Sequence, residues 1–441
     1  MSAAWGAAAK SCNALLVRVE QNDVTLTELV ILPSKSFGAV EVERLAAALG
    51  DNTNLTTISA SGHAIPPAAL GILGMALVKS KTLKRIAIGD KNMGDEGVAA
   101  LFEDKGCGAL ESIDLAYKNI SEEGMKILGA FLGDSTTLID LNLSRNPIIS
   151  NQGVVAFCEA ASGDTLTTSS SLRTINLSEC QIGAQGMESL AKLLIQTTGC
   201  TTLGLSSNPL GPLSCSSLVS LLQEGNLQSL QLASCELGDA GVTSLCQTIK
   251  ACTGLRILDL SDNGIGAEGA NEFAKSLQGD CWKAMKELKL ANNSIGSDGM
   301  TAIAEALSSL ETLDATQTKC GVQGATSILR ATGLKRLRLF NNELGSEGFK
   351  AIAAMLPECR LLELDLGGNR ADADDLLLLL QTLRATERIT LKVLEIGGNA
   401  TSMEVEEEIK QIKKVHPDLD IARDRPRQEE DEQDTPSIIE A

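Results

Sequence analysis

The sequence predicts an α/β solenoid, a horseshoe of stacked units with parallel strands on its concave face and helices on its convex face. Three observations predict this fold class. A motif of the form LxxLxLxxNxIxxxG recurs along the chain, as in Leu255 to Gly269. Its copies are spaced by about 28 residues, which is a solenoid-like period. Aromatic residues make up only 2% of the chain, so the core must be built from aliphatic side chains.

The motif begins fourteen times along the chain, which has 441 residues. Length alone would suggest about three domains of roughly 150 residues. The repeat overrides that estimate, because stacked units bury one continuous core. The sequence therefore predicts one solenoid over residues 26–400. The copies begin at Leu26, Leu55, Leu83, Leu110, Leu138, Leu172, Cys200, Leu227, Leu255, Met285, Leu310, Leu334, Leu361 and Leu391.

Each LxxLxL segment is predicted to be a short strand whose leucines point into the core, because side chains alternate along a strand. The ninth position turns the chain, and an Asn amide there can bond backbone groups that the turn leaves unpaired. Cys180, Cys235 and His63 occupy this position in three copies. We therefore expect His63 to have a role in a turn rather than in catalysis.

A helix is predicted after each turn, because apolar residues then recur three to four positions apart. Gly269, Phe273 and Leu277 show this spacing in one copy. The small residue at the start of the helix lets neighbouring units approach closely. Each repeat is thus expected to be a strand, a turn and an outer helix.

A repeat of about 28 residues, with IGxxG before the helix and Asn or Cys in the turn, resembles the ribonuclease-inhibitor type of leucine-rich repeat. That subfamily includes ribonuclease inhibitor, the Ran GTPase-activating proteins and the sensor ends of NOD-like receptors. The resemblance covers about residues 26–400. It implies a leucine-rich repeat solenoid and is compatible with many functions.

Polar caps are expected at both ends of the array. Residues 1–25 are predicted to cap the N-terminus. Residues 401–417 are predicted to form a C-terminal capping helix, because Thr401-Ser-Met-Glu404 is a capping-box pattern and Pro417 ends the segment. Residues 418–441 are predicted to be a charged, disordered tail.

One repeat is longer than the others, since Leu138 and Leu172 are 34 residues apart. The additional residues lie in the segment 163–171, which is rich in Ser and Thr. A surface loop without a specific role is the simplest interpretation. A contact or phosphorylation loop is the alternative.

Several kinds of site are not predicted by this sequence. Gly264 to Gly269 matches G-x-G-x-x-G, but two of its glycines belong to the repeat, so no nucleotide site or cofactor is expected. Twelve Cys without a C-x-x-C pair, and only two His, argue against a zinc site. The cysteines are expected to be reduced thiols in the cytoplasm, with a disulfide framework as the alternative.

Charge and hydropathy exclude further classes of partner. The net charge of −19 disfavours nucleic-acid binding and favours approach of a basic protein. The N-terminus has no basic residue before its Ala run, which argues against a secretory signal. The longest purely aliphatic run, Leu376 to Leu380, is far too short to span a membrane. No small-molecule substrate is predicted.

Candidate binding residues lie on the concave face, at strand position 5 and turn positions 7 and 8 of the repeats. Tyr117 is the chain's only Tyr, and Phe340 is a second ring at an exposed turn position. Tyr, Trp and Arg dominate binding hot spots. The alternatives are that each ring packs on its neighbouring turn and that the charged residues form a solvated face. The candidate protein-binding residues are Tyr117, Arg145, Glu179, Asp259, Asp262, Lys289, Arg338 and Phe340.

The sequence as a whole favours a non-catalytic scaffold that binds a protein partner on the concave face. Neither a phosphate-binding loop nor a catalytic constellation is recognisable in it. A nuclease inhibitor is one possibility within this class. The alternative is a regulator of a small GTPase, because Leu391 to Asn399 and the acidic helix that follows look like the C-terminal end of the Ran GTPase-activating proteins. A free-standing sensor domain is a third possibility.

Overall fold

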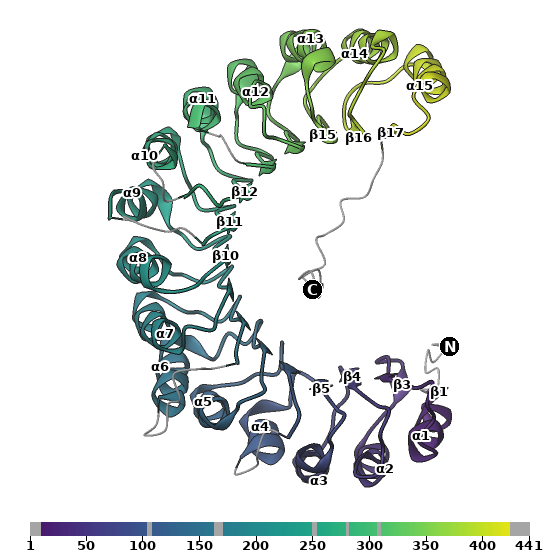
Figure 1. Ribbon diagram of the computed structural model, residues 1–441, viewed down its shortest axis with the longest axis vertical. Coiled ribbons are helices and arrows are strands. Elements are labelled where there is room, and N and C mark those ends of the chain that lie inside the picture. The colour runs from purple at the N-terminus through teal and green to yellow at the C-terminus, as the bar shows by residue number, and fades with distance from the viewer. Residues whose placement is uncertain are drawn as a thin grey trace, which may run out of the picture. The chain divides into compact units, whose positions relative to one another are not determined.

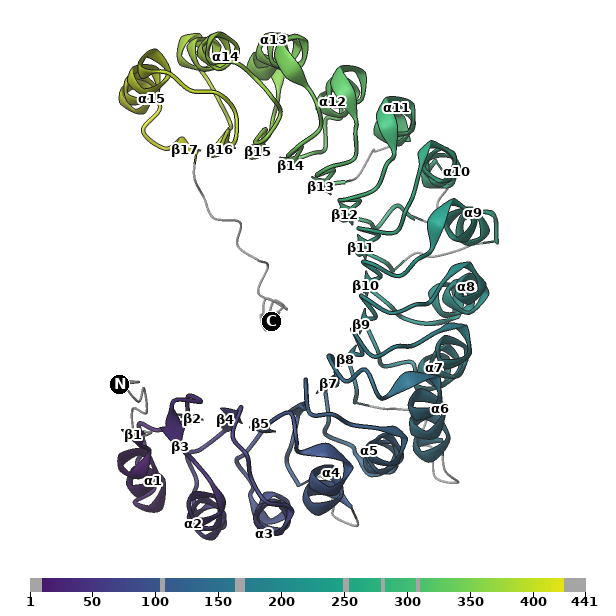
Figure 2. The same ribbon diagram turned by 180° about the vertical axis from the view of Figure 1, so that it is seen from behind.

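A computed structural model of the protein describes residues 10–103, 108–162, 171–248, 254–278, 282–306 and 310–423. The chain forms two compact units: the N-terminal unit contains residues 1–237 and 248–255, and the C-terminal unit contains residues 238–247 and 256–441. In each unit strands and helices alternate along the chain, with strands on one side and helices on the other (Figure 1, and from behind in Figure 2). The predicted solenoid fold class is confirmed. A single solenoid over residues 26–400 stays a prediction.

The N-terminal unit has eight strands in one parallel ladder among its described residues, in the order β2-β4-β5-β6-β7-β8-β9-β10. A separate parallel pair, β1 and β3, precedes it. The elements are β1 (Lys10–Ser11), α1 (Asn13–Glu20), β2 (Glu28–Val30), β3 (Lys35–Ser36), α2 (Ala39–Leu49), β4 (Thr57–Ser61), α3 (Pro67–Lys79), β5 (Arg85–Gly89), α4 (Gly94–Phe102), β6 (Ser112–Asp114), α5 (Glu122–Asp134), β7 (Asp140–Asn142), α6 (Ser150–Ala161), β8 (Thr174–Asn176), α7 (Ala184–Thr197), β9 (Thr202–Gly204), η1 (Pro212–Ser214), α8 (Cys215–Glu224) and β10 (Ser229–Gln231).

The C-terminal unit has seven strands in its described part, β11 to β17, and these are also parallel. A parallel strand needs a crossover before the next strand, and here each outer helix is that crossover. The elements are α9 (Gly238–Thr248), β11 (Ile257–Asp259), α10 (Ala267–Leu277), β12 (Glu287–Lys289), α11 (Gly296–Ala306), β13 (Thr312–Asp314), α12 (Gly321–Leu329), β14 (Arg336–Arg338), α13 (Gly345–Met355), η3 (Leu356–Glu358), β15 (Glu363–Asp365), α14 (Ala373–Ala385), β16 (Val393–Glu395), α15 (Met403–Val415) and β17 (Asp420–Ala422).

Neighbouring strands pair so that each residue lies opposite the same position of the next repeat. Asp114 of β6 lies opposite Asn142 of β7, and Asn142 lies opposite Asn176 of β8. Counted from the first leucine of the motif, the residues at positions 1, 4 and 6 are buried, as Leu138, Leu141 and Leu143 show. We call the opposite side, formed by positions 3, 5, 7 and 8, the strand face of each unit.

The ninth position forms a ladder of buried side-chain amides, as the sequence predicts. Asn146 donates from Nδ2 to the carbonyl oxygens of Leu115 and Leu143, at 2.9 and 2.8 Å. Its Oδ1 accepts the backbone N–H groups of Lys118 and Ile120 in the preceding repeat. This buried amide thus joins two repeats. The backbone groups that it bonds would be costly in free energy to leave without a hydrogen-bond partner.

Cys180 and His63 occupy the ninth position in two other repeats, and each side chain there lies beside a backbone carbonyl. The thiol of Cys180 donates to the Leu143 carbonyl at 3.2 Å. His63 is buried, and its Nε2 lies 3.1 Å from the carbonyl oxygen of Ile31. The surroundings of His63 therefore agree with the turn role that the sequence predicts for it.

The C-terminal end differs from the prediction in two respects. The capping helix α15 begins one residue later than the capping-box pattern suggests, because Ser402 is its N-cap and accepts the backbone N–H of Val405. Residues 420–422, expected to belong to a disordered tail, form β17 and pair with β16. The ladder thus continues past the last leucine motif, because the backbone of β16 offers an unpaired edge to the next segment. Residues 424–441, and residues 163–170 of the predicted loop, lie outside the described residues.

Candidate protein-binding face

Position 8 of the repeat has a backbone conformation that the sequence analysis did not foresee. Tyr117, Arg145 and Glu179 have φ angles of 58°, 59° and 57°. This left-handed conformation is uncommon for residues other than Gly, Asn and Asp. Each of the three backbone N–H groups donates to the next repeat, that of Tyr117 to the Ser144 carbonyl at 2.9 Å. The repeat imposes the conformation, and the side chains are carried outward at its strand face.

These three residues form one row on the strand face of the N-terminal unit. The side chain of Tyr117 is exposed, at 57%. The guanidinium of Arg145 forms an ion pair with the Glu179 carboxylate, with 3.0 Å between Nε and Oε1. Both charged side chains are about half exposed, so the pair adds little stability. The row thus offers an aromatic ring, a cation and an anion in successive repeats.

The remaining candidates belong to the strand face of the C-terminal unit. In position 5, Lys289 lies opposite Asp259 on one side and opposite Asp314 on the other. Asp314 in turn lies opposite Arg338, and their side chains form an ion pair at 3.4 Å. These four side chains form a column of alternating charge, because the pairing register places position 5 of one repeat beside position 5 of the next repeat.

Asp262 and Phe340 occupy turn positions in the same unit. Asp262 has a φ angle of 53° and donates its backbone N–H to the Ala291 carbonyl at 2.8 Å. Phe340 is only half-buried, and its ring covers the backbone of Gly367 and Gly368 in the next repeat. A Cβ atom at Gly367 would come within 2.8 Å of this ring. Phe340 therefore packs on the neighbouring turn, which was the alternative considered for both rings. Tyr117 instead projects into solvent.

A buried lysine next to Tyr117 was not singled out from the sequence. Lys118 takes the ninth position, where other repeats have Asn, and donates from Nζ to the Ala116 carbonyl at 2.8 Å. Burial lowers the pKa of Lys118, while Asp114 and Asp90 act in the opposite direction. The sequence signal that could have revealed Lys118 is a Lys at the ninth position, where several other repeats have Asn.

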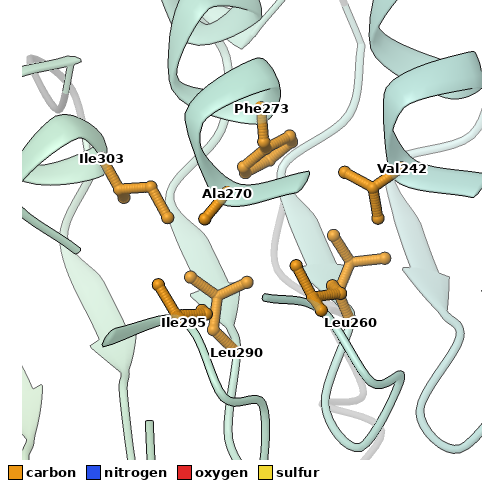
Figure 3. A pocket seen from close by; sticks show the side chains of 8 residues that line it. Val242, Leu260, Ala270, Phe273, Leu290, Ile295 and Ile303 are labelled. Carbon is orange, nitrogen blue, oxygen red and sulfur yellow. The ribbon is translucent and has the colours of Figure 1, made fainter. Parts of the chain in front are cut away.

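The pocket drawn in Figure 3 lies in the core of the C-terminal unit. Its lining is entirely aliphatic or aromatic, with no polar group to orient a substrate. Side chains from α9, α10 and α11 meet side chains of the turns that follow β11 and β12 there. The lining residues are Val242, Leu260, Ile265, Ala270, Phe273, Leu290, Ile295 and Ile303.

The described residues contain no group of three or more His, Cys, Asp or Glu side chains that is arranged to hold a metal ion. No described helix is long and apolar enough to cross a bilayer. The nine described cysteines are all free thiols.

A family model described as "Leucine Rich repeat" matches six segments of the chain, at residues 134–158, 168–191, 226–246, 251–274, 285–304 and 332–353. These segments coincide with strand–turn–helix units of the fold. The chain is a leucine-rich repeat protein. The leucine-rich repeat that the motif indicates is thereby confirmed.

The curated relatives of this leucine-rich repeat protein place its repeats in the ribonuclease-inhibitor-like type. It is 30% identical to ribonuclease inhibitor of Mus musculus over 257 residues, which cover 56% of this chain and 55% of that protein. It is 28% identical to ribonuclease inhibitor of Sus scrofa, with 46% and 45% covered. It is 29% identical to NACHT, LRR and PYD domains-containing protein 12 of Homo sapiens, with 52% and 21% covered. The chain thus spans about half the length of the two inhibitors.

Solved structures with similar folds are more distant in sequence. An internalin of Listeria monocytogenes has a TM-score of 0.45 at 16% identity, with 94% of both chains covered. A leucine-rich repeat protein of Leptospira interrogans has a TM-score of 0.46 at 16% identity, with 93% of this chain and 99% of that chain covered.

Proposed function

We propose that this leucine-rich repeat protein is a non-catalytic scaffold that binds a protein partner on its strand face. The observation that carries the proposal is the row of Tyr117, Arg145 and Glu179, which exposes an aromatic ring and two charges at backbone positions held by the repeat. A Tyr on a rigid frame contributes a large contact area at low cost in conformational entropy. The similarity to proteins named ribonuclease inhibitor supports a partner that is itself a protein.

A basic partner fits the chemistry of the chain. The net charge of −19 would attract a cationic protein and raise its rate of association at low ionic strength. Cytoplasmic residence is part of the same proposal. The free state of the nine described cysteines supports a reducing compartment.

The test compares two triple variants of the N-terminal unit. The first, Tyr117→Ala with Arg145→Ala and Glu179→Ala, removes an exposed ring and an ion pair from the strand face. The matched control, Leu213→Ala with Glu188→Ala and Lys192→Ala, removes an exposed apolar side chain and an ion pair from the helical side. Each variant is used to capture proteins from native lysate, and the captured partner is then purified and titrated calorimetrically. Circular dichroism and thermal unfolding verify the fold.

We expect the strand-face variant to weaken binding at least about tenfold, or about 1.4 kcal/mol, while the control binds like the parent. Equal binding by both variants would contradict the proposal for this unit. Arg338→Ala with Phe340→Ala tests the strand face of the C-terminal unit in the same way. If the captured protein is a small GTPase, a hydrolysis assay decides between a passive scaffold and the alternative regulatory function.

A further inference from the structure

The outer helix α3 of the N-terminal unit is apolar on the side that faces solvent as well as on the side that faces the core. Its inward side chains are buried. Its outward side chains include Ile72, Met75 and Val78, whose exposed fractions are 39%, 54% and 41%. The helix has a single charged residue, Lys79, at its last position. A helix that is apolar all round is normally buried all round.

The other described α-helices have polar or charged side chains on their outward sides. Glu43 of α2 and Glu96 of α4 show this for the two neighbours of α3. Figure 1 shows α3 between these two helices, on the side of the unit opposite the strands. Its 13 residues are too few to cross a bilayer. The outward side of α3 is therefore suited to contact with another protein surface, and it is separate from the strand face.

Gly71 on this side of α3 is not required by the packing of the described residues. The only heavy atom within 4 Å of a Cβ placed there would be the Ala100 carbonyl oxygen of α4, at an ordinary contact distance of 3.6 Å. Gly inside a helix is nevertheless less favourable than Ala. The missing side chain leaves a hollow in the outward surface, which allows the close approach of a second chain.

The large and small residues of this side follow a regular spacing. Residues seven apart lie two turns apart on the same side of a helix. Gly71 and Val78 form one such pair and lie toward α4, because the position of the missing Cβ faces that helix. Ile72 and Lys79 form a second pair, on the side toward α2. Met75 lies near the middle of both pairs.

This spacing makes the outward side of α3 complementary to an antiparallel copy of itself, related by a two-fold axis at Met75. Val78 of each copy then lies over the hollow at Gly71 of the other. The aliphatic part of Lys79 lies along Ile72 of the other copy. Large side chains thus face small ones, which is the arrangement that packed layers need in order to interdigitate.

The charges beside α3 favour the antiparallel arrangement over a parallel one. Glu43, in the N-terminal half of α2, and Lys79 are both exposed, and neither pairs with another charge among the described residues. In the antiparallel pair, Lys79 of one copy extends past Ile72 of the other copy toward the Glu43 carboxylate of that copy. In a parallel pair the two Lys79 ammonium groups would lie at the same level, where they would repel each other.

We propose that two copies of this chain associate through α3, antiparallel about a two-fold axis at Met75, with Val78 of each copy over Gly71 of the other. A standard interface buries roughly 800 Å² per partner, which is more than the outward side of one helix provides. We therefore expect a weak dimer, with a dissociation constant of roughly 1–100 μM. This inference uses the helical side alone and stands independently of the proposed function.

Sedimentation equilibrium of the full chain, between about 1 and 500 μM, tests this proposal. We expect the parent protein to form a dimer and Met75→Glu to weaken it at least tenfold. Gly71→Leu fills the hollow and should weaken the dimer to a similar extent. Its thermal midpoint should not fall below that of the parent, because Leu favours a helix more than Gly does. The matched control is Leu213→Glu, at an exposed position on the helical side of the same unit, which should associate like the parent.

Charge reversal and cross-linking test the antiparallel arrangement. Lys79→Glu should weaken the dimer several fold, and the addition of Glu43→Lys should restore it. Met75→Cys should form a disulfide between chains under mild oxidation, whereas Leu213→Cys should not. The parent protein, whose described cysteines are free thiols, gives the baseline.

Three results would overturn the proposal. The first is a parent protein that stays monomeric up to about 500 μM. The second is self-association that does not respond to Met75→Glu or Gly71→Leu. The third is a monomeric parent from which Met75→Glu removes a different bound protein, since the outward side of α3 would then belong to that partner and not to a second copy.

Discussion

The carboxylate of Asp239, in the first turn of α9, accepts the backbone N–H of Gly269 in the first turn of α10, with 3.1 Å between Oδ1 and N. The same oxygen accepts the N–H of Gly266 at 2.7 Å. The first N–H groups of a helix have no partner within the helix itself. One helix therefore caps the next, at a site about 30 residues further along the chain.

The same arrangement recurs in the N-terminal unit. Asp95 of α4 accepts the N–H of Gly124 at the start of α5, and Asn151 of α6 accepts the N–H of Gly186 at the start of α7. It explains why the motif needs a small residue here. A Cβ atom at Gly269 would lie 2.5 Å from the Asp239 carboxylate.

Removal of this inter-helix cap should destabilise the C-terminal unit. Asp239→Ala leaves two backbone N–H groups without their acceptor, and loss of a helix cap costs about 1–2 kcal/mol. Urea unfolding followed by circular dichroism measures the free energy of unfolding. Glu268→Ala is the matched control, because this carboxylate is exposed in the first turn of α10 and should contribute at most about 0.5 kcal/mol. Equal effects of the two variants would show that the cap contributes no more than the helix dipole.

The amide ladder should be more sensitive than the caps. Asn293 accepts the N–H groups of Asn263 and Ile265 and donates to the Leu260 and Leu290 carbonyls. Asn293→Ala leaves several buried polar groups unpaired, which should lower the free energy of unfolding by about 2–4 kcal/mol.

The neighbouring residue supplies the control for this measurement. Asn292 is exposed and has a φ angle of 58°, so Asn292→Gly should change the free energy of unfolding by no more than about 0.5 kcal/mol. Chemical unfolding of both variants under identical conditions tests the difference. If Asn293→Ala is as mild as Asn292→Gly, the ladder does not hold the repeats together.

Tyr117 should be dispensable for stability even if it is needed for binding. Its left-handed backbone costs roughly 1 kcal/mol for an ordinary residue, and Asn tolerates this conformation better. Tyr117→Asn should therefore leave the free energy of unfolding unchanged or raise it by up to about 1 kcal/mol. Thermal and urea unfolding provide the measurement. A loss of more than about 1 kcal/mol would mean that the exposed ring stabilises the fold, which would weaken its assignment to a binding surface.

The buried thiols should make the protein less stable at alkaline pH. Burial raises the pKa of Cys158, Cys180, Cys200 and Cys320 from 9.0 to about 12. Above pH 9 the unfolded chain loses these protons while the folded chain keeps them. Their contribution to stability is therefore fully present below pH 9 and is lost as the pH rises toward 12, by about 1.4 kcal/mol per pH unit and thiol.

A single substitution isolates this effect. Cys200→Ala lowers stability at every pH, but it removes one titrating thiol, so its loss of stability between pH 9 and 10.5 should be shallower than that of the parent by about 1.4 kcal/mol per unit. Urea unfolding at four pH values gives the two slopes. Identical slopes would show that Cys200 ionises in the folded protein as readily as in the unfolded chain.

Much of the fold could be predicted from the chain because each repeat encodes its own local structure. The LxxLxL pattern of Leu138 to Leu143 specifies a strand with three inward side chains, and Asn146 at the ninth position specifies the buried turn. The period of about 28 residues specifies that such units stack. The turn role of His63 followed from its position alone.

The candidate site was predictable only as a set of positions. The pattern correctly placed Tyr117, Arg145 and Glu179 on the outward side, but it did not show their positive φ angles or the ion pair between the last two. The pattern predicted an exposed ring at Phe340, but in the structure this ring lies against Gly367 and Gly368 of the next repeat. β17 carries no leucine motif, and its strand structure depends on pairing with β16.

The sequence by itself determined the fold class, the inward and outward positions of each repeat and the identity of the turn residues, because these depend on neighbours a few residues away. The tertiary structure alone decided which helix caps the next, which charges pair across strands and which ring is covered. Those interactions join residues roughly 24 to 34 positions apart, and they exist only once the parallel register has brought successive repeats into contact.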